Sequence, residues 1–263
     1  MYKVGIIGFG KMGSAIIKGA ISKNVLNKKD ILISVRREEQ YLDLVSSGFN
    51  ATLNTKDIYT KCNIIILAIK PQMLEMVCSD ALNYSFEGKC IASILAGVKI
   101  SKLEGMFPSS LVVRIMPNTP ALIGKCVATM SYNLENPLVD DVKKIFEAIG
   151  TYEVIEESLM DETLPLNGSM PAYLYLFAKV FIERATQNGV DYDKAKSLTL
   201  EAIKASADMV LASNDSIDTL INNVCSKGGT TIAGLNELYD NGFVDSIQKC
   251  YDACMNRSKE LAK

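Results

Sequence analysis

The sequence contains no histidine and no tryptophan among its 263 residues. The absence of histidine excludes a Ser-His-Asp or Cys-His nucleophilic site and any histidine metal ligand. It also removes the side chain most often used for proton transfer near neutral pH. Any chemistry that the protein performs must therefore proceed without imidazole.

An excess of positive charge is also missing. The chain carries 28 Lys and Arg residues against 30 Asp and Glu residues, which gives a formal net charge of -2 at pH 7. A protein that binds nucleic acid usually needs a clustered basic surface. We therefore expect no nucleic-acid partner.

Long hydrophobic runs are absent too. The apolar runs at residues 64–69 and 91–98 are too short to span a membrane, and Met1 leads into a strand-like run without the basic segment of a signal peptide. The seven cysteines are scattered and form no C-x-x-C pair, which argues against a zinc site. We expect no metal, reduced thiols and a cytoplasmic protein that does not contact a membrane.

Short β-rich runs alternate with helical stretches up to about residue 157. The run Ile64-Ile65-Ile66-Leu67 is apolar at successive positions, as expected of a strand covered on both faces. The expected strands are Tyr2–Ile7, Ile31–Val35, Ala51–Leu53, Ile64–Ile69, Cys90–Leu95, Leu111–Ile115 and Tyr152–Ile155. The expected helices are Met12–Ser22, Glu38–Ser46, Gln72–Ser79, one that begins with a capping box at Ser101-Lys102-Leu103-Glu104, and Asp140–Ile149. This alternation predicts a parallel, doubly wound sheet.

Past residue 158 only helices are expected. They are Pro171–Asn188, Asp193–Leu211, Ser216–Val224, Thr230–Tyr239 and Val244–Leu261. The first is apolar around much of its circumference, which indicates burial in a subunit interface or, equally, inside the same monomer. The predicted fold class is thus α/β, with an N-terminal Rossmann-type doubly wound sheet in residues 1–158 and an all-α domain in residues 159–263.

A glycine-rich motif follows the first expected strand and opens a helix. Gly8-Phe9-Gly10-Lys11-Met12-Gly13 is a G-x-G-x-x-G pattern in the context that predicts dinucleotide binding. The first glycine allows the tight turn, the second lets the backbone approach the pyrophosphate, and the third lets helix pack on strand. Free amides at the helix start then face the phosphates.

The second expected strand ends in Ser34-Val35-Arg36-Arg37. A fold that prefers NAD usually has a carboxylate at this place, ~20 residues past the glycines. A hydroxyl and two guanidinium groups suit a 2′-phosphate instead, because Arg offers bidentate donors to it. The residues predict NADPH in preference to NADH. The alternative is that Arg36 and Arg37 are solvated surface residues.

Four further motifs are more specific than periodicity can explain. They are Leu67–Gln72 (LAIKPQ), Ser93–Val98 (SILAGV), Arg114–Ala121 (RIMPNTPA) and Gly228–Leu235 (GGTTIAGL). Together and in this order they resemble the pyrroline-5-carboxylate reductase family, from Val4 to about Lys259. The resemblance implies an NAD(P)H-dependent oxidoreductase of the cytoplasm that reduces 1-pyrroline-5-carboxylate to L-proline, the last step of proline biosynthesis. It also implies a homodimer formed through the helical domain, or a higher homo-oligomer.

The resemblance further implies roles for individual residues. Cofactor contacts are implied for Ile7, Gly8, Phe9, Gly10, Lys11, Met12, Gly13, Ser34, Arg36, Arg37, Thr55, Ala68, Ile69, Lys70, Pro71, Leu95, Ala96, Gly97 and Asn223. Substrate contacts are implied for Asn118, Ser169, Gly229, Thr230 and Thr231. Thr231 is expected to be the catalytic residue, as hydrogen-bond or proton donor.

The stretch Gly228-Gly229-Thr230-Thr231 also has a direct physical interpretation. A glycine turn that leads into a helix presents backbone amides to an anion, such as a substrate carboxylate. Thr231 would then hydrogen-bond the ring nitrogen, on which negative charge would otherwise build up during reduction of C=N. The alternative interpretation is an ordinary helix start.

Two departures from the family pattern lie near the expected substrate pocket. Asn167-Gly168-Ser169-Met170 stands where the family usually has Ser-Gly-Ser-Gly, and Ser226-Lys227 stands where it has Ser-Pro. They motivate one alternative function, the reduction of another cyclic imino acid. A non-catalytic NADPH-binding regulator is a second alternative.

Overall fold

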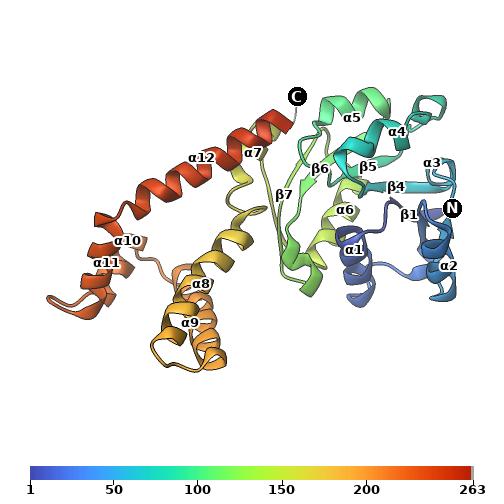
Figure 1. Cartoon of the computed structure of the whole chain (residues 1–263). Coiled ribbons are helices and arrows are strands. Elements are labelled where there is room, and N and C mark those ends of the chain that lie inside the picture. The colour runs from blue at the N-terminus through green and yellow to red at the C-terminus, as the bar shows by residue number, and fades with distance from the viewer. Residues whose placement is uncertain (262–263) are drawn as a thin grey trace. The chain divides into compact units, whose positions relative to one another are not determined.

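The computed structural model describes residues 1–261, which form two compact units (Figure 1). Unit 1 comprises residues 1–171 and the segment from residue 254 onward, and unit 2 comprises residues 172–253. The chain therefore leaves unit 1 and returns to it near the C-terminus. The domain boundary expected between residues 158 and 159 stays a prediction.

Unit 1 is built around an eight-stranded sheet with the order β3-β2-β1-β4-β5-β6-β7-β8. The strands are β1 (Tyr2–Ile7), β2 (Ile31–Ser34), β3 (Asn50–Thr52), β4 (Cys62–Leu67), β5 (Cys90–Ser93), β6 (Leu111–Met116), β7 (Cys126–Tyr132) and β8 (Gly150–Val154). All neighbours are parallel except β6 and β7. The strand order reverses between β1 and β4, which is where doubly wound sheets bind ligands. The predicted Rossmann-type sheet is confirmed.

Strand β4 shows why the sheet needs a core on each face. Ile64 and Ile66 belong to one apolar cluster, and Ile65 and Leu67 belong to another. All four side chains are fully buried. Because successive side chains point to opposite faces of a strand, the two clusters lie on opposite sides of the sheet. This accounts for the unbroken apolar run in the sequence.

Helices and 3-10 turns connect the strands of unit 1. The helices are α1 (Lys11–Ser22), α2 (Glu38–Ser46), α3 (Lys56–Lys61), α4 (Leu74–Val77), α5 (Ile100–Met106), α6 (Pro137–Glu147) and α7 (Met160–Thr163). The 3-10 turns are η1 (Lys28–Asp30), η2 (Pro71–Met73), η3 (Ala81–Asn83), η4 (Thr119–Ile123) and η5 (Glu157–Leu159). Most of the longer helices begin and end within a few residues of the expected positions.

The capping box expected at Ser101 is wrong. Helix α5 begins at Ile100, and its N-cap is Lys99, two residues before Ser101, with no side-chain cap. A carboxylate from a distant segment satisfies the first amide instead, because Ile100 N donates to Glu157 Oε1 at 2.7 Å. The single helix expected at residues 72–79 is also wrong, because the structure has the 3-10 turn η2 followed by the short helix α4 in this place.

Strand β7 and helix α3 have no counterpart among the expected elements. Strand β7 carries Thr129 and Ser131, which are polar yet buried, so its sequence lacks the apolar signature of the other central strands. Helix α3 has only six residues, four of which are charged or polar besides Tyr59 and Ile58. Neither hydrophobic periodicity nor length marks these elements.

The C-terminal end of the last helix, α12 (Phe243–Leu261), belongs to unit 1. Ser258 Oγ donates to Asp161 Oδ1 at 2.8 Å. The same carboxylate oxygen lies 3.6 Å from Arg114 Nη2, on a guanidinium that is only 1% exposed. This end of the helix is thus tied to the buried charge of β6.

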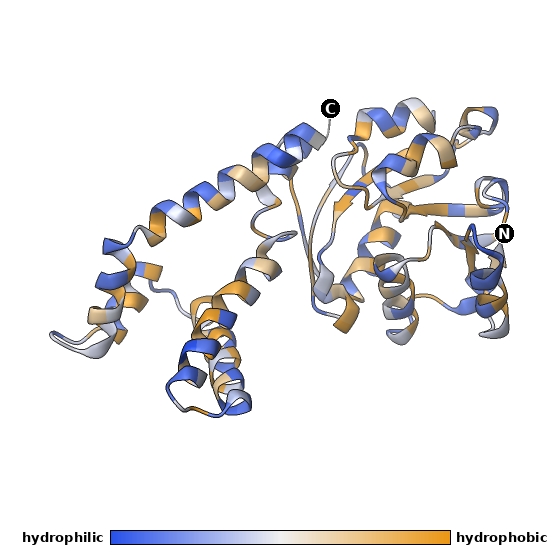
Figure 2. Ribbon diagram, viewed as in Figure 1, coloured by the Kyte–Doolittle hydropathy of each residue, from blue (hydrophilic) through white to orange (hydrophobic). Residues whose placement is uncertain are grey.

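Unit 2 consists of helices only, as predicted. It contains most of α8 (Met170–Gln187), then α9 (Tyr192–Ala212), α10 (Ile217–Val224), α11 (Thr230–Asp240) and the start of α12. Its buried apolar cluster is small and consists of Ala178, Ile182 and Ala195 among the described residues. Large apolar side chains of α8 are instead exposed: Leu174, Tyr175, Leu176, Val180 and Phe181. Figure 2 shows the corresponding hydrophobic stretches along α8.

Within residues 1–261, no helix combines the length and hydropathy that crossing a bilayer requires.

Candidate functional site

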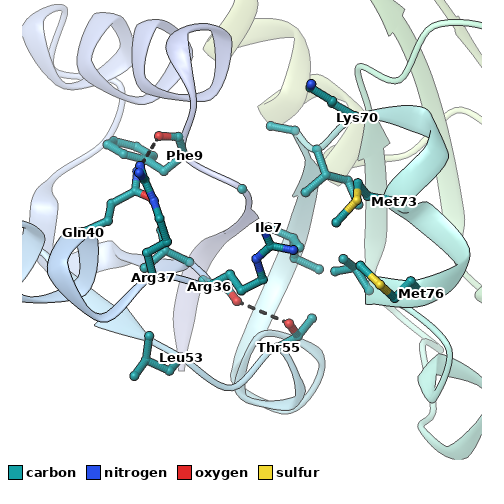
Figure 3. A pocket seen from close by; sticks show the side chains of 16 residues that line it. Ile7, Phe9, Arg36, Arg37, Gln40, Leu53, Thr55, Lys70, Met73 and Met76 are labelled. Atoms are coloured by element: carbon teal, nitrogen blue, oxygen red, sulfur yellow. Dashed lines mark hydrogen bonds between the residues drawn. The ribbon is translucent and has the colours of Figure 1, made fainter.

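A pocket of about 620 Å³ lies in unit 1, at the carboxyl ends of β1, β2 and β4 (Figure 3). Parallel strands end at the same edge of a sheet, so the residues that follow these strands meet there. The pocket is lined by ten residues for which a cofactor contact was expected: Ile7, Gly8, Phe9, Ser34, Arg36, Arg37, Thr55, Ala68, Ile69 and Lys70.

The glycine-rich loop forms one wall of this pocket. Gly8 has a φ of +92°, and a Cβ at this position would lie 2.7 Å from the carbonyl oxygen of Ala68. A Cβ on Gly13 would lie 2.8 Å from the Gly8 carbonyl oxygen, whereas one on Gly10 would meet nothing within 4 Å. The fold therefore requires glycine at positions 8 and 13, and the open side of Gly10 lets a ligand approach the backbone. Helix α1 has no side-chain cap, so its first amides are available to an anion.

The end of β2 supplies a second wall, with positive charge. Arg36 and Arg37 are exposed, and neither pairs with a carboxylate within the described chain. Ser34 is buried, and its hydroxyl oxygen lies 3.4 Å from that of Thr55. Figure 3 shows the Arg36 guanidinium in the pocket, toward the side that carries Met76. None of the described residues that line this pocket carries a carboxylate. The donor set fits a phosphate monoester such as the 2′-phosphate of NADPH.

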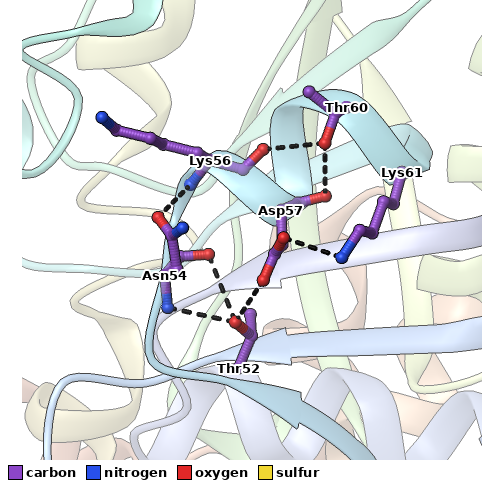
Figure 4. A network of polar contacts seen from close by, with 6 residues as sticks. All are labelled: Thr52, Asn54, Lys56, Asp57, Thr60 and Lys61. Carbon is purple, nitrogen blue, oxygen red and sulfur yellow. Dashed lines mark hydrogen bonds and ion pairs between the residues drawn. The ribbon is translucent and has the colours of Figure 1, made fainter.

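A polar network holds the loop that carries Thr55 (Figure 4). Thr52 Oγ1 donates to Asp57 Oδ2 at 2.6 Å and accepts from the amide of Asn54 at 3.0 Å. Lys61 Nζ lies 2.7 Å from the other oxygen of Asp57. Lys61 and Thr52 together hold the pKa of Asp57 below its usual value. The loop is therefore fixed from both sides of Thr55.

Six further residues line the pocket, and no cofactor contact is expected for them from the sequence. They are Val35, Gln40, Leu53, Met73, Met76 and Val77. Met73 and Met76 stand three positions apart just after the Lys70-Pro71 segment, so helical spacing could have indicated them. Gln40 carries no such signal, because its Nε2 donates to the carbonyl oxygen of Phe9, 31 positions away in the sequence.

The other expected cofactor contacts of unit 1 do not line the pocket. These residues are Gly10, Lys11, Met12, Gly13, Pro71, Leu95, Ala96 and Gly97. The first four form the turn into α1, and Pro71 opens η2 directly after Lys70. Residues 95–97 follow β5, the parallel neighbour of β4. All of them lie at the same edge of the sheet, and their contact with a cofactor stays a prediction.

Asn118 follows β6, but its side chain is buried and bonded inside the protein. Its Oδ1 accepts from the amide of Val127 at 2.9 Å, and its Nδ2 donates to the carbonyl oxygen of Asn167 at 3.1 Å. Ser169 lies in the same part of unit 1, where its hydroxyl oxygen is 3.2 Å from Cys254 Sγ. The expected substrate contacts of Asn118 and Ser169 stay predictions.

A second pocket, of about 520 Å³, lies within unit 2. Helices α9, α10 and α11 line it, mostly with apolar side chains, and Asn223 and Thr231 are among its few polar residues. Helix α11 begins at Thr230, after Gly228 with a φ of +71° and after Gly229 as an N-cap without a side-chain bond. An apolar pocket beside uncapped helix amides can bind a small molecule that carries one anionic group.

The structure thus groups the expected residues into two sets. Ten of the expected cofactor contacts line the pocket of unit 1, and Asn223 and Thr231 line the pocket of unit 2, where Gly229 and Thr230 directly precede Thr231 in the chain. No group of three or more Cys, Asp or Glu side chains suited to a metal ion occurs within residues 1–261.

Two family models match the chain. The first is described as pyrroline-5-carboxylate reductase dimerisation and matches residues 157–261. The second is described as NADP oxidoreductase coenzyme F420-dependent and matches residues 3–97. The second match covers the glycine-rich loop and the strands that form the pocket of unit 1.

Full-length relatives agree with these matches. The chain is 33% identical to pyrroline-5-carboxylate reductase from Methanosarcina acetivorans, over 99% of this chain and 98% of that protein. A crystal structure of Plasmodium falciparum pyrroline carboxylate reductase with NADP bound has a TM-score of 0.90 at 30% identity, over 100% of this chain and 98% of that chain. The Streptococcus pyogenes 1-pyrroline-5-carboxylate reductase has a TM-score of 0.88 at 30% identity, over 98% of both chains. The chain belongs to the pyrroline-5-carboxylate reductase family.

Proposed function

We propose that this chain is an oxidoreductase that reduces 1-pyrroline-5-carboxylate to L-proline with NADPH, the last step of proline biosynthesis. Full-length similarity to reductases of this name is the observation that carries the proposal. The pocket of unit 1 supports it, because its glycine-rich loop and its Ser34, Arg36 and Arg37 side chains suit a phosphorylated dinucleotide.

The residues of unit 1 hold the cofactor. NADPH, when bound, supplies the hydride that adds to the carbon of the C=N bond. Amides of the glycine-rich loop and of the first turn of α1 bind the pyrophosphate. Ser34, Arg36 and Arg37 bind the 2′-phosphate, and Thr55 supports the Ser34 hydroxyl. The segments 68–71 and 95–97 hold the nicotinamide portion at the edge of the sheet.

The residues of unit 2 act on the substrate. The uncapped amides after Gly229 bind its carboxylate, which orients the ring. Thr231 donates a hydrogen bond to the ring nitrogen and so stabilises the charge that develops there. Asn223, in the same pocket, contacts the cofactor. As hydride adds to the carbon, the nitrogen becomes strongly basic and takes its proton through this hydrogen bond, and water replaces the proton on the Thr231 hydroxyl, so the chemistry needs no histidine.

The protein forms homo-oligomers, and we propose a homodimer through the helical domain. The family model that covers this domain is described by dimerisation. The exposed apolar side chains of α8 are consistent with it, because a contiguous exposed apolar surface usually marks an interface. We place the enzyme in the cytoplasm, where its seven free cysteines stay reduced.

A spectrophotometric assay tests the proposed function. Purified protein is mixed with NADPH and racemic pyrroline-5-carboxylate, and the absorbance of the reduced nicotinamide is followed. We expect oxidation of NADPH, with L-proline as product. Turnover of a six-membered cyclic imino acid in preference to the five-membered one would indicate a different substrate. Tight binding of NADPH without oxidation would indicate a regulator.

A further inference from the structure

Two asparagine side chains hold three segments of unit 1 together. Asn167 lies in the turn before α8 and is 4% exposed. Its Nδ2 donates to the carbonyl oxygens of Met116 at 2.8 Å and of Val127 at 3.4 Å. The backbone carbonyl oxygen of Asn167 accepts a hydrogen bond from Asn118 Nδ2, and Asn118 Oδ1 accepts one from the amide of Val127. The end of β6, the start of β7 and the turn before α8 are thereby joined.

The orientation of the Asn167 side chain is determined by these neighbours. Two carbonyl oxygens face the same side-chain atom, which must therefore be the nitrogen. The opposite atom, Oδ1, is buried and has no hydrogen-bond partner. Burying this acceptor without a partner costs free energy, which the two hydrogen bonds donated by Asn167 Nδ2 offset.

Ser169, two residues later, is held from another direction. Its amide donates to the carbonyl oxygen of Leu164 at 3.0 Å. Its hydroxyl lies 3.2 Å from Cys254 Sγ, on the part of α12 that belongs to unit 1. The Ser169 hydroxyl is thus held against α12, and Asn167 holds the same turn against the sheet.

We propose that Asn167 is a positioning residue for the imino-acid substrate. By anchoring its segment to Met116 and Val127, it sets the location of the Ser169 hydroxyl relative to the carboxyl edge of the sheet. This role rests on the proposed function and on the substrate contact that the family resemblance implies for Ser169. Asn167 acts through Ser169, because its own amide is buried against two backbone carbonyls. A serine at position 167 would have one proton to donate and could not bind both of these carbonyls.

The variant Asn167→Asp tests this role with almost no change of volume. Its carboxylate has no proton to donate and would face two carbonyl oxygens. We expect kcat/KM for pyrroline-5-carboxylate to fall about tenfold or more, while the Kd of NADPH changes by less than about twofold. Asn167→Ser keeps one donor and serves as the second variant if Asn167→Asp fails to fold; we expect the same split with a smaller loss. Asn83→Asp, on the exposed turn η3, is the matched control and should behave as wild type.

A double-variant cycle with Ser169→Ala separates positioning from general destabilisation. If Asn167 acts through Ser169, the double variant is no slower than the slower single variant. Fully additive losses would overturn the role of Asn167. A loss of NADPH affinity that parallels the loss of kcat/KM would overturn it as well, since a general structural defect would affect both ligands.

Failure of the proposed function has a different signature. Wild-type protein that does not reduce pyrroline-5-carboxylate refutes that function without reference to Asn167. Amide hydrogen exchange then decides whether Asn167 fixes the segment. Faster exchange of residues 164–170 in Asn167→Asp, but not in Asn83→Asp, supports the anchoring. Unchanged exchange in both variants rules it out.

Discussion

Gln40 reaches from the first turn of α2 to the glycine-rich loop, where its Nε2 donates a hydrogen bond to the carbonyl oxygen of Phe9 at 2.8 Å (Figure 3). This bond joins the helix that follows Arg36 and Arg37 to the loop proposed to bind the pyrophosphate. One side chain therefore connects the two walls of the pocket.

Replacement of Gln40 by leucine should weaken the binding of NADPH and NADH alike. Loss of one hydrogen bond that orders the loop should raise both dissociation constants about 3- to 10-fold. Fluorescence of the bound nicotinamide measures both constants. A loss confined to NADPH would show that Gln40 acts on the 2′-phosphate and not on the loop.

The double variant Arg36→Ala, Arg37→Ala should distinguish the two cofactors. It removes the positive charge at the end of β2, so we expect NADPH affinity to fall by about 10- to 100-fold, as for the loss of charge-assisted hydrogen bonds. NADH lacks the phosphate and should bind as it does to wild type. Unchanged NADPH affinity would show that the two arginines are solvated surface residues.

Two glycines of the loop should respond differently to alanine. At Gly13 the added Cβ would meet the Gly8 carbonyl oxygen at 2.8 Å, so Gly13→Ala should destabilise the protein by about 1–3 kcal/mol. At Gly10, the N-cap of α1, the added Cβ would meet nothing within 4 Å, so Gly10→Ala should cost less than about 1 kcal/mol. Gly10→Ala should nevertheless weaken NADPH binding, because the methyl group occupies the space of the pyrophosphate. Thermal unfolding and the Kd of NADPH together check this contrast, and wild-type affinity in Gly10→Ala would contradict it.

Thr231→Val should lower turnover by about 10–100-fold, the loss expected from removing one hydrogen bond of the transition state. Valine keeps the shape of threonine and removes only the hydroxyl. Thr231→Ser restores the hydroxyl and should recover most of the activity. Steady-state kinetics with saturating NADPH measure both variants, and wild-type kcat in Thr231→Val would show that another group serves as the donor.

Asp57 should contribute to stability at neutral pH and lose that contribution in acid. Its pKa is lowered in the folded protein, first by the hydrogen bond with Lys61 and then by that with Thr52. The contribution is therefore complete above the unfolded value near 3.8 and disappears as the pH falls through the lower folded value. Asp57→Asn should cost about 0.5–1 kcal/mol at pH 7, as for a partly exposed ion pair. Urea unfolding of both proteins at pH 7 and in strong acid measures this; an equal difference at both pH values would contradict it.

The fold followed from the sequence wherever local chemistry dominates. In a chain of alternating strands and helices, the apolar run of β4 predicts a strand covered on both faces, and the glycines after β1 predict a tight turn that binds a dinucleotide. The sheet, the loop and the pocket wall could therefore be predicted. The cation pair after β2 was predictable for the same reason, since the end of that strand must lie beside the loop.

What could not be predicted depends on contacts between distant residues. The first amide of α5 is satisfied by Glu157 and not by Ser101, a solution invisible in the local spacing. Strand β7 buries Thr129 and Ser131 through its antiparallel place beside β6, which its own composition does not reveal. Gln40 and Asn167 matter through bonds that cross 31 to 51 positions of sequence.

The return of the chain to unit 1 has a consequence for how this protein folds during translation. Ser258 binds Asp161, and Lys259 Nζ lies 2.7 Å from Glu162 Oε1, so the dinucleotide-binding unit is discontinuous in sequence. The sheet can assemble while translation continues, but the unit is complete only after residues 254–259 have left the ribosome. A fragment that ends at residue 171 would leave the partners of these residues exposed to water, although it contains every strand.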